Sequence, residues 1–437
     1  MISLRRRLTD GHLSAALAGS LVSLTTKLAA AAAGVALTFL VARRFGAAGS
    51  GAWVLANTIL SIAGYVALCG LDYGSTRAIA IYKAAGRWGM ARAWTWTGIL
   101  IVLVVGGAVT ALTRLASPLI ASALSENATS ATVMTIMSFA IIPYAAIRLA
   151  VGSFRAVRRF AIADALESGV IPALLASLML ALNIQRLDEV ARGYVAVAAI
   201  AAAGGLLGWF AILQGKSGAR EPLMPREALV RSVPLGGTVL ASLASPWIVT
   251  LFLAHFATTA EVGVYRVALQ FALLLGFLLT AVETGLSPQI AALHSQNKLT
   301  ELSNSAKQMT LLLLLVGGIP CLALLVFSGF FLSILGPEFP QGATAMRILI
   351  AAQLFSLATG PVGSFMVMTG LERTSFRNAI IGTGIVLTLG LLLIPHFGIV
   401  GAAIASGSAT VFRNTAATVV VWRRHGLFLP LGIVRRK

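Results

Sequence analysis

The sequence predicts an all-α polytopic membrane protein, with about twelve transmembrane helices in two six-helix lobes and a central cavity between them. Two kinds of observation predict this fold: the composition and the length of its apolar stretches, and an internal repeat. Of the 437 residues, 58% are hydrophobic and only 11% are charged. This composition, with a mean hydropathy of +0.91, is typical of a chain whose solvent is lipid.

The apolar stretches predict the individual helices in order. A helix needs about 20 residues to cross about 30 Å of hydrocarbon. Twelve such stretches lie between clusters of charged residues: 14–42, 51–71, 94–113, 132–151, 165–183, 193–213, 234–256, 265–287, 309–330, 343–368, 377–395 and 398–421. Six fall in an N-terminal lobe (1–214) and six in a C-terminal lobe (234–437), joined by a cytoplasmic linker (215–233) that contains Gly, Ser and Pro. Within the linker, residues 226–231 are predicted to form a short amphipathic helix on the membrane surface.

Short segments of the first half return in the second half. The pairs are Asp72-Tyr73-Gly74 with Glu283-Thr284-Gly285, Gly152-Ser153-Phe154 with Gly363-Ser364-Phe365, and Gly51-Ala52-Trp53 with Gly263-Val264-Tyr265. The first two pairs have the same spacing of 211 residues, and the third has one residue inserted. Because each lobe has an even number of helices, both enter the membrane from the same side, and we expect a pseudo-twofold axis along the membrane normal. Parallel repeats of this kind are typical of transporters, which bind substrate between the repeats.

The Lys and Arg residues predict the orientation, because cytoplasmic loops are enriched in them. With the N-terminus inside, 24 Lys and Arg residues fall on the cytoplasmic side and 7 on the outer side. Both termini are therefore predicted to be cytoplasmic. The net charge of +19 is then a topology signal and a source of contacts with anionic lipid head groups, and nucleic-acid binding is excluded.

The sequence gives no sign of catalysis, metal binding or a cofactor. Cys69 and Cys321 lie in separate apolar spans and the five histidines are scattered, so neither a metal site nor a disulfide framework is predicted. The chain has no Walker loop, G-x-S-x-G or H-E-x-x-H motif. A membrane enzyme, such as an oligosaccharide polymerase or ligase, would need a large outward loop that this chain lacks. We predict a protein that is not an enzyme.

Two cations inside the spans, Lys27 and Arg413, are the candidate substrate-binding residues. A charge at the centre of a membrane helix costs about 2.5–3.5 kcal/mol and usually faces a cavity. Lys27 lies 16 residues before Arg43, near the middle of the first span, where it would hold an anionic head group. The alternatives are a shifted first helix or an internal ion pair for Lys27, and an interfacial position or an internal pair for Arg413.

Two acids at equivalent positions of the repeat, Asp72 and Glu283, are the candidates for coupling or gating. Each lies at the predicted cytoplasmic end of its helix, where it would pair with basic loop residues or exchange a proton. The alternative for Asp72 is a residue at a helix end, solvated or salt-bridged to Arg77. Arg148, near the inner end of its span, is interpreted as mainly structural.

Further motifs occur in a fixed order along the whole chain. They are Ala42-Arg43-Arg44-Phe45-Gly46, Gly51-Ala52-Trp53, Leu71-Asp72-Tyr73-Gly74, Gly263-Val264-Tyr265, Ser287-Pro288, Ile334-Leu335-Gly336-Pro337-Glu338-Phe339, Met346-Arg347-Ile348-Leu349, Met368-Thr369-Gly370-Leu371-Glu372-Arg373 and Gly398-Ile399-Val400-Gly401-Ala402-Ala403-Ile404-Ala405. Their order and spacing resemble the polysaccharide-transporter branch of the multidrug/oligosaccharidyl-lipid/polysaccharide exporter superfamily, which includes the bacterial O-antigen flippases.

The resemblance implies a function. A protein of this branch would flip a polyprenyl-diphosphate-linked oligosaccharide, such as an O-antigen, exopolysaccharide or capsule repeat unit, across the bacterial inner membrane by alternating access driven by an ion gradient. Its implied partners are the lipid-linked glycan, membrane lipids, and polysaccharide polymerase and chain-length proteins. The alternative is a cation-coupled multidrug exporter of the same superfamily. Those exporters usually carry an acidic coupling residue in the middle of the first lobe, whereas the first helix here carries Lys27.

Overall fold

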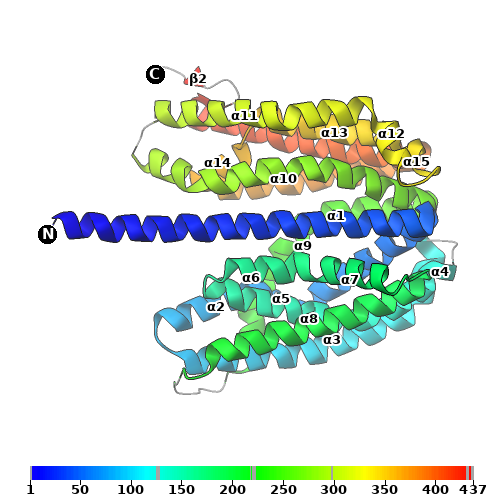
Figure 1. Cartoon of the computed structure of the whole chain (residues 1–437), viewed down its shortest axis with the longest axis horizontal. Coiled ribbons are helices and arrows are strands. Elements are labelled where there is room, and N and C mark those ends of the chain that lie inside the picture. Colours follow the sequence, from blue (N-terminus) through cyan, green and yellow to red (C-terminus); the bar gives the residue numbers. More distant parts are fainter. Residues whose placement is uncertain are drawn as a thin grey trace. The chain divides into compact units, whose positions relative to one another are not determined.

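The computed structural model describes the backbone of residues 2–124, 128–216, 218, 223–296, 299–429 and 433–434, and nearly all of these residues are helical (Figure 1). The elements are α1 (Ile2–Leu68), α2 (Leu71–Ala84), α3 (Trp88–Leu124), α4 (Ala128–Met137), η1 (Ser138–Ala140), α5 (Ile141–Ala156), α6 (Phe160–Asp164), η2 (Ala165–Gly169), α7 (Val170–Ala181), α8 (Leu187–Leu213), α9 (Pro225–Phe256), α10 (Thr259–Ser295), α11 (Leu299–Val326), α12 (Ser328–Ser333), η3 (Phe339–Gly342), α13 (Ala343–Thr359), α14 (Val362–Met368), α15 (Glu372–His425), β1 (Leu427–Phe428) and β2 (Ile433–Val434). The two short strands pair antiparallel, with Leu427 opposite Val434.

The described residues contain nine helices that are long and apolar enough to cross a membrane, and the bent helix α9 makes ten. Two of the nine are too long for one crossing. In α1, the stretch Thr25–Leu68 alone has 44 residues, and α15 has 54, so each would be at least about twice as long as the hydrocarbon is thick if it were straight. Each is broken at a glycine with positive φ, Gly46 (65°) and Gly398 (49°). Counting each broken helix as two spans gives the predicted number of spans and confirms the all-α polytopic architecture.

At Gly398 the backbone reverses direction. A Cβ atom added to Gly401 would lie 2.4 Å from the carbonyl oxygen of Leu393, a contact between residues eight apart that a continuous helix does not allow. Glycine is favoured at Gly398 because its φ lies in the left-handed region. The predicted spans 377–395 and 398–421 therefore form a hairpin, divided at the position expected from the sequence.

The chain divides into two compact units. The first contains Met1–Leu40 and Leu55–Leu240, and the second contains Val41–Val54 and Ala241–Lys437.

The helix predicted at 226–231 is not a separate element, because it forms the first turns of α9. These turns pack in the first unit, against α2.

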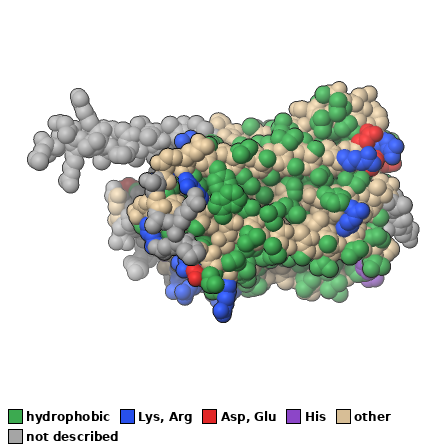
Figure 2. Space-filling model, turned by 90° about the horizontal axis from the view of Figure 1, so that it is seen from below, with side chains coloured by type: hydrophobic (Ala, Val, Ile, Leu, Met, Phe, Trp, Pro, Cys, Tyr) green, Lys and Arg blue, Asp and Glu red, His purple; other side chains and the backbone are tan. Residues whose placement is uncertain are grey.

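Apolar side chains remain exposed where a membrane would cover them. On α3, Val104, Leu115 and Leu119 are 64%, 76% and 72% exposed. Figure 2 shows apolar side chains over the middle of the visible face, with Lys and Arg side chains gathered toward its ends. This is the distribution expected of helices whose middle lies in hydrocarbon and whose ends lie in the head-group region.

The repeated glycines pack against each other within the second unit. A Cβ atom on Gly51 would lie 1.7 Å from the carbonyl oxygen of Thr259, and one on Gly263 would lie 2.1 Å from that of Ala47. Gly51 and Gly263 are equivalent in the predicted repeat, and each faces the residue four positions before the other. A reciprocal contact of this kind is what two segments related by a twofold axis make.

We expect Gly51→Ala to destabilise the protein, because the added methyl group overlaps a backbone oxygen that cannot rotate away. Overpacking of this kind costs about 1–3 kcal/mol, so the thermal unfolding temperature of the detergent-solubilised protein should fall by several degrees. Gly34→Ala, on the same helix with nothing within 4 Å, is the matched control and should leave that temperature unchanged or slightly raised. Equal unfolding temperatures for the two variants would contradict the close contact.

Candidate functional site

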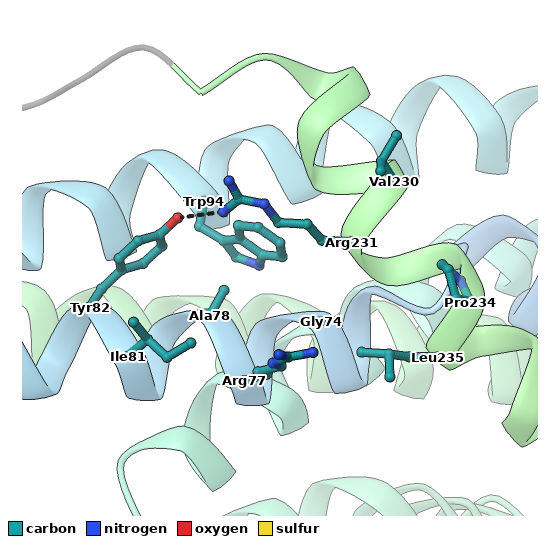
Figure 3. Close-up of a pocket in the computed structure, with 10 residues that line it drawn as sticks. All are labelled: Gly74, Arg77, Ala78, Ile81, Tyr82, Trp94, Val230, Arg231, Pro234 and Leu235. Carbon is teal, nitrogen blue, oxygen red and sulfur yellow. Dashed lines mark hydrogen bonds between the residues drawn. The ribbon is translucent and has the colours of Figure 1, made fainter.

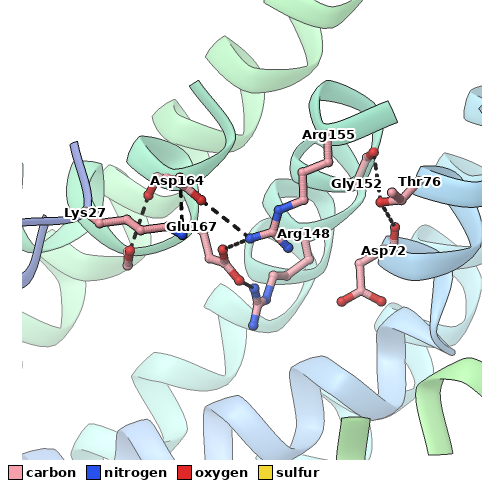
Figure 4. Close-up of polar contacts among 9 residues, drawn as sticks. Lys27, Asp72, Thr76, Arg148, Gly152, Arg155, Asp164 and Glu167 are labelled. Carbon is pink, nitrogen blue, oxygen red and sulfur yellow. Dashed lines mark hydrogen bonds and ion pairs between the residues drawn. The ribbon is translucent and has the colours of Figure 1, made fainter. Parts of the chain in front are cut away.

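The first unit contains a network of ion pairs between four segments (Figure 4). Lys27 lies on α1, and Arg148 and Arg155 lie on α5, seven residues apart and therefore on one face of the helix. Asp164 ends α6, and Glu167 lies in η2, a π-helical segment. Single π-helical turns widen the helix locally and frequently occur at functional sites. This turn places both carboxylates opposite the arginines of α5.

Glu167 is the centre of the network. One of its carboxylate oxygens bonds Arg148 and the other bonds Arg155. Arg155 also lies 3.7 Å from Asp164. The Arg148 guanidinium stands over the Tyr65 ring, 4.8 Å from its centroid, and a cation in this position is attracted by the ring. The network thus surrounds two arginines with carboxylates and an aromatic face.

Lys27 completes the network. Its Nζ atom lies 3.9 Å from Asp164 Oδ2, and its side chain is 43% exposed whereas that of Asp164 is 7% exposed. The internal ion pair that sequence analysis held as an alternative is therefore present. The exposed ammonium remains accessible to a ligand, and its substrate role stays a prediction.

Asp72 lies next to this network, in the first turn of α2. The predicted span 51–71 ends at Leu68, but Asp72 does not end the helical chain, which resumes at Leu71 and continues to Ala84. The interruption includes Gly70, with φ 75°, where a Cβ atom would lie 2.3 Å from the carbonyl oxygen of Ser232. The break therefore lets α9 approach α2 closely.

The Asp72 carboxyl is 5% exposed and accepts a hydrogen bond from the Tyr73 backbone N–H at 2.9 Å. Burial raises its pKa to about 6, although the Tyr73 N–H and the Arg155 charge act to lower it. The ion pairs of the described residues do not include one between Asp72 and Arg77. Glu283 lies in α10, but its side chain falls outside the described residues. The coupling roles of both acids stay predictions.

The second unit contains a cavity of about 620 Å³. Helices α10, α13, α14 and α15 supply its walls. Its polar lining consists of Gln353, Ser356, Ser375, Asn378, Ser406, Thr410, Arg413 and Asn414. Among the described lining residues there is no Asp, Glu, Lys or His. The cavity is therefore rich in hydrogen-bonding groups, and among its described lining residues Arg413 carries the one formal charge.

The last helix supplies one polar face of this cavity. Ser406, Thr410, Arg413 and Asn414 follow the spacing of one helix face. The Asn414 amide donates to the Thr410 carbonyl oxygen at 3.0 Å and to Ser356 Oγ at 3.3 Å. In the part of the chain that the structure describes, the buried Nδ2 of Asn378 has no hydrogen-bond partner. A buried donor without a partner costs about 1–3 kcal/mol, so this amide is available to a ligand's acceptor.

Arg413 faces the cavity without a compensating carboxylate. Its Nη2 donates a long hydrogen bond of 3.5 Å to Thr410 Oγ1, and its stem packs 3.1 Å from the position of a Cβ on Gly382. Across the described ranges, no ion pair includes Arg413. The internal pairing considered for Arg413 is therefore not seen there.

Sequence analysis missed the partners of both sites. Arg148 was interpreted as mainly structural, and Glu167 was not singled out, although a carboxylate within the predicted span 165–183 was a usable signal. The amides of Asn378 and Asn414 were missed because only charged residues were sought. Within the described residues, no group of three His, Cys, Asp or Glu residues could hold a metal ion.

A family model named MatE matches residues 234–392. The structure of the lipid II flippase MurJ in an inward closed conformation superposes with a TM-score of 0.74 at 12% identity, covering 93% of this chain and 87% of MurJ. An inward-facing multidrug resistance MATE family transporter of the MOP superfamily superposes with a TM-score of 0.69 at 15% identity, covering 93% and 98% of the two chains. The fold is that of MATE transporters and MurJ.

A curated relative is the "Probable flippase AglR" of Haloferax volcanii, which is 28% identical to this chain over 176 residues. The match covers 38% of this chain and 36% of AglR, so it spans about a third of the length of the curated relatives. The solved structures confirm the fold that the resemblance implies. The relatives are transporters and flippases by name, and the chain is a multi-span membrane protein.

We expect Glu167→Gln to be strongly destabilising, because it leaves the partly buried Arg148 guanidinium without a carboxylate and leaves Arg155 with Asp164 alone, at 3.7 Å. Removing one partner of a buried ion pair costs about 3–5 kcal/mol. Asp188→Asn is the control, since its partners Arg186 and Arg192 are 71% and 68% exposed, and exposed pairs contribute about 0–1 kcal/mol. Thermal unfolding in detergent measures both. Similar losses for the two variants would contradict the network's role.

The raised pKa of Asp72 predicts a pH-dependent effect of Asp72→Asn. A folded-state pKa of about 6, against an ordinary value of 3.8, means that the folded protein binds more protons between these values, so its stability falls as pH rises from about 4 to about 6. The variant should therefore unfold at a higher temperature than the wild type at pH 7.5, and this advantage should vanish near pH 4. An advantage that does not change with pH would show that Asp72 is not titrating in this range.

Proposed function

We propose that the chain is a flippase for a glycan linked to a polyprenyl diphosphate, which it moves across the cell membrane by alternating access. The observation that supports this most is the cavity of the second unit, where Arg413 lies among amide and hydroxyl groups and the described lining residues include no carboxylate. Such a site favours an anion that also carries many hydroxyl groups.

The chemistry of the cavity fits a phosphate attached to a sugar. A guanidinium donates paired hydrogen bonds to phosphate oxygens. The amides and hydroxyls around it can donate to and accept from sugar hydroxyl groups, and Asn378 has a donor available for this. The volume of about 620 Å³ lies within the range of about 300–1,000 Å³ that is usual for ligand sites.

The relatives support the same substrate class. MurJ is a lipid II flippase and AglR is named a flippase. We therefore assign to this chain a lipid-linked glycan as substrate and membrane lipids as partners. The bacterial O-antigen specificity, the polymerase and chain-length partners and the inner-membrane location with cytoplasmic termini stay predictions from the resemblance and the basic residues.

The first unit would supply the coupling. With Asp72 ionised, the three cations Lys27, Arg148 and Arg155 face three carboxylates. A proton or a substrate phosphate that enters this network would change its pairing, because the partly exposed Lys27 ammonium is held by Asp164 at the long distance of 3.9 Å. Asp72, with a pKa of about 6, would exchange a proton near neutral pH, and Glu283 is its counterpart in the repeat.

A cation-coupled multidrug exporter is the second candidate, because the MATE transporter shares the fold over 93% of this chain. The carboxylates of the first unit would be its cation sites. However, Asp164 and Glu167 are both occupied by arginines, and a cationic drug in the second unit would meet Arg413. The flippase is therefore the better fit.

We expect deletion of the gene to cause lipid-linked oligosaccharide to accumulate in the cytoplasmic leaflet. Wild-type protein should clear it, whereas Arg413→Gln should clear it about 10 to 100 times more slowly, because a hydrogen bond to a charged group contributes about 1.5–3 kcal/mol. Arg413→Lys should restore part of the rate by keeping the charge.

Arg423→Gln is the matched control, because it removes an exposed arginine from the same helix, and it should clear the intermediate as fast as the wild type. Expression of each variant is checked in the membrane fraction. If nothing accumulates after deletion and the efflux of a fluorescent cation falls instead, the flippase proposal is wrong and the drug exporter takes its place.

A further inference from the structure

A second cavity, of about 500 Å³, lies in the first unit where α2, α3 and the start of α9 meet (Figure 3). Two arginines contribute to it, Arg77 from α2 and Arg231 from α9. It shares no lining residue with the ion-pair network or with the cavity of Arg413. The proposed transport function therefore does not account for it.

Close backbone contacts hold the cavity's walls in place. A Cβ atom on Gly236 would lie 2.8 Å from the Cα of Gly70, and one on Gly74 would lie 2.0 Å from Ser232 Oγ. These glycines let α9 lie directly on α2. The contact fixes the helix that carries Arg231 against the helix that carries Arg77, so both guanidinium groups reach one cavity.

The two arginines lack acidic partners. Arg231 donates a long hydrogen bond of 3.5 Å to the Tyr82 hydroxyl. Neither Arg77 nor Arg231 forms an ion pair with any residue in the described ranges, and Glu227, one turn earlier on α9, is not paired with Arg231. The described lining contains no carboxylate. Two like charges in one cavity repel each other, and an anion bound to both would remove this repulsion.

The remaining lining is apolar and aromatic. Ile81 and Val230 are 57% and 67% exposed, although both border the cavity. Trp94 is buried, and its indole N–H donates to Ser75. Apolar side chains beside a pair of guanidinium groups match an amphiphile, because an acyl chain can cover the former while a phosphate binds the latter.

The position of the cavity suits a head group. α2 is not among the apolar spans of the described residues, and the same end of the first unit carries further cations. Burial lowers the pKa of Lys216, and the neighbouring charges of Lys83 and Arg159 lower it further. This end, which the positive-inside rule assigns to the cytoplasm, therefore attracts anionic lipid.

We propose that the cavity between α2, α3 and α9 binds the phosphate head group of an anionic phospholipid, held by Arg77 and Arg231 with an acyl chain along Ile81 and Val230. The lipid would connect the start of α9, which lies within the predicted linker 215–233, to α2. The proposal does not depend on which substrate the protein transports.

Native mass spectrometry of the detergent-purified full chain tests this proposal. We expect one phosphatidylglycerol molecule to bind at least about tenfold more tightly than phosphatidylcholine with the same acyl chains, because only the former carries a net negative charge. The double variant Arg77→Gln/Arg231→Gln should lose this preference. Lys83→Gln/Arg87→Gln removes two exposed cations from the same end and should retain it. Thermal unfolding without added lipid verifies that each variant is folded.

Three outcomes would overturn the proposal. Equal loss of the preference in both double variants would show diffuse surface attraction and no defined site. Binding of inorganic phosphate alone, as tight as that of phosphatidylglycerol, would show a site for a free anion. Binding of polyprenyl diphosphate at this site, without binding of phosphatidylglycerol, would assign the cavity to the transported lipid.

Discussion

The cost of placing a charge in hydrocarbon governs the structure. Lipid offers no water to backbone or side-chain polar groups, so the chain folds almost entirely into helices that satisfy their own backbone hydrogen bonds. Charged side chains within the spans must then find partners inside the protein. Glu167 meets this requirement in the first unit by bonding both Arg148 and Arg155. The π-helical turn that contains Glu167 places its carboxylate opposite these arginines.

In the second unit, Arg413 does not meet this requirement among the described residues. Arg413 faces a cavity whose described lining contains amides and hydroxyls but no acid. A guanidinium in this setting is most stable when an anion occupies the cavity, and the polar lining adds a preference for a substrate rich in hydroxyl groups. The fold alone does not distinguish a flippase from a drug exporter, because a MATE transporter shares it. Arg413, which lacks the carboxylate partners of the arginines in the first unit, favours an anionic substrate and therefore the flippase.

The architecture was predictable because it depends on local sequence properties. Apolar length and charge clusters placed the breaks near Gly46 and Gly398 correctly, and the reciprocal contact of Gly51 and Gly263 supports the predicted repeat. The site was only partly predictable. Lys27 and Arg413 were found because cations are rare in apolar spans, but the pairing of Lys27 with Asp164 depends on how α1 and α6 pack, which a single sequence does not encode locally. The continuation of the chain into α2 after Gly70 was missed for the same reason.

The proposed activity of this chain is the movement of a lipid-linked glycan between leaflets. Purified protein reconstituted into liposomes that contain a lipid-linked oligosaccharide in both leaflets tests it directly, with an added glycan-modifying enzyme that reaches only the outer leaflet. We expect the protein to make the inner-leaflet pool accessible and an imposed ion gradient to change the rate. An inner-leaflet pool that stays protected, in liposomes where the same protein transports a fluorescent organic cation, would contradict it.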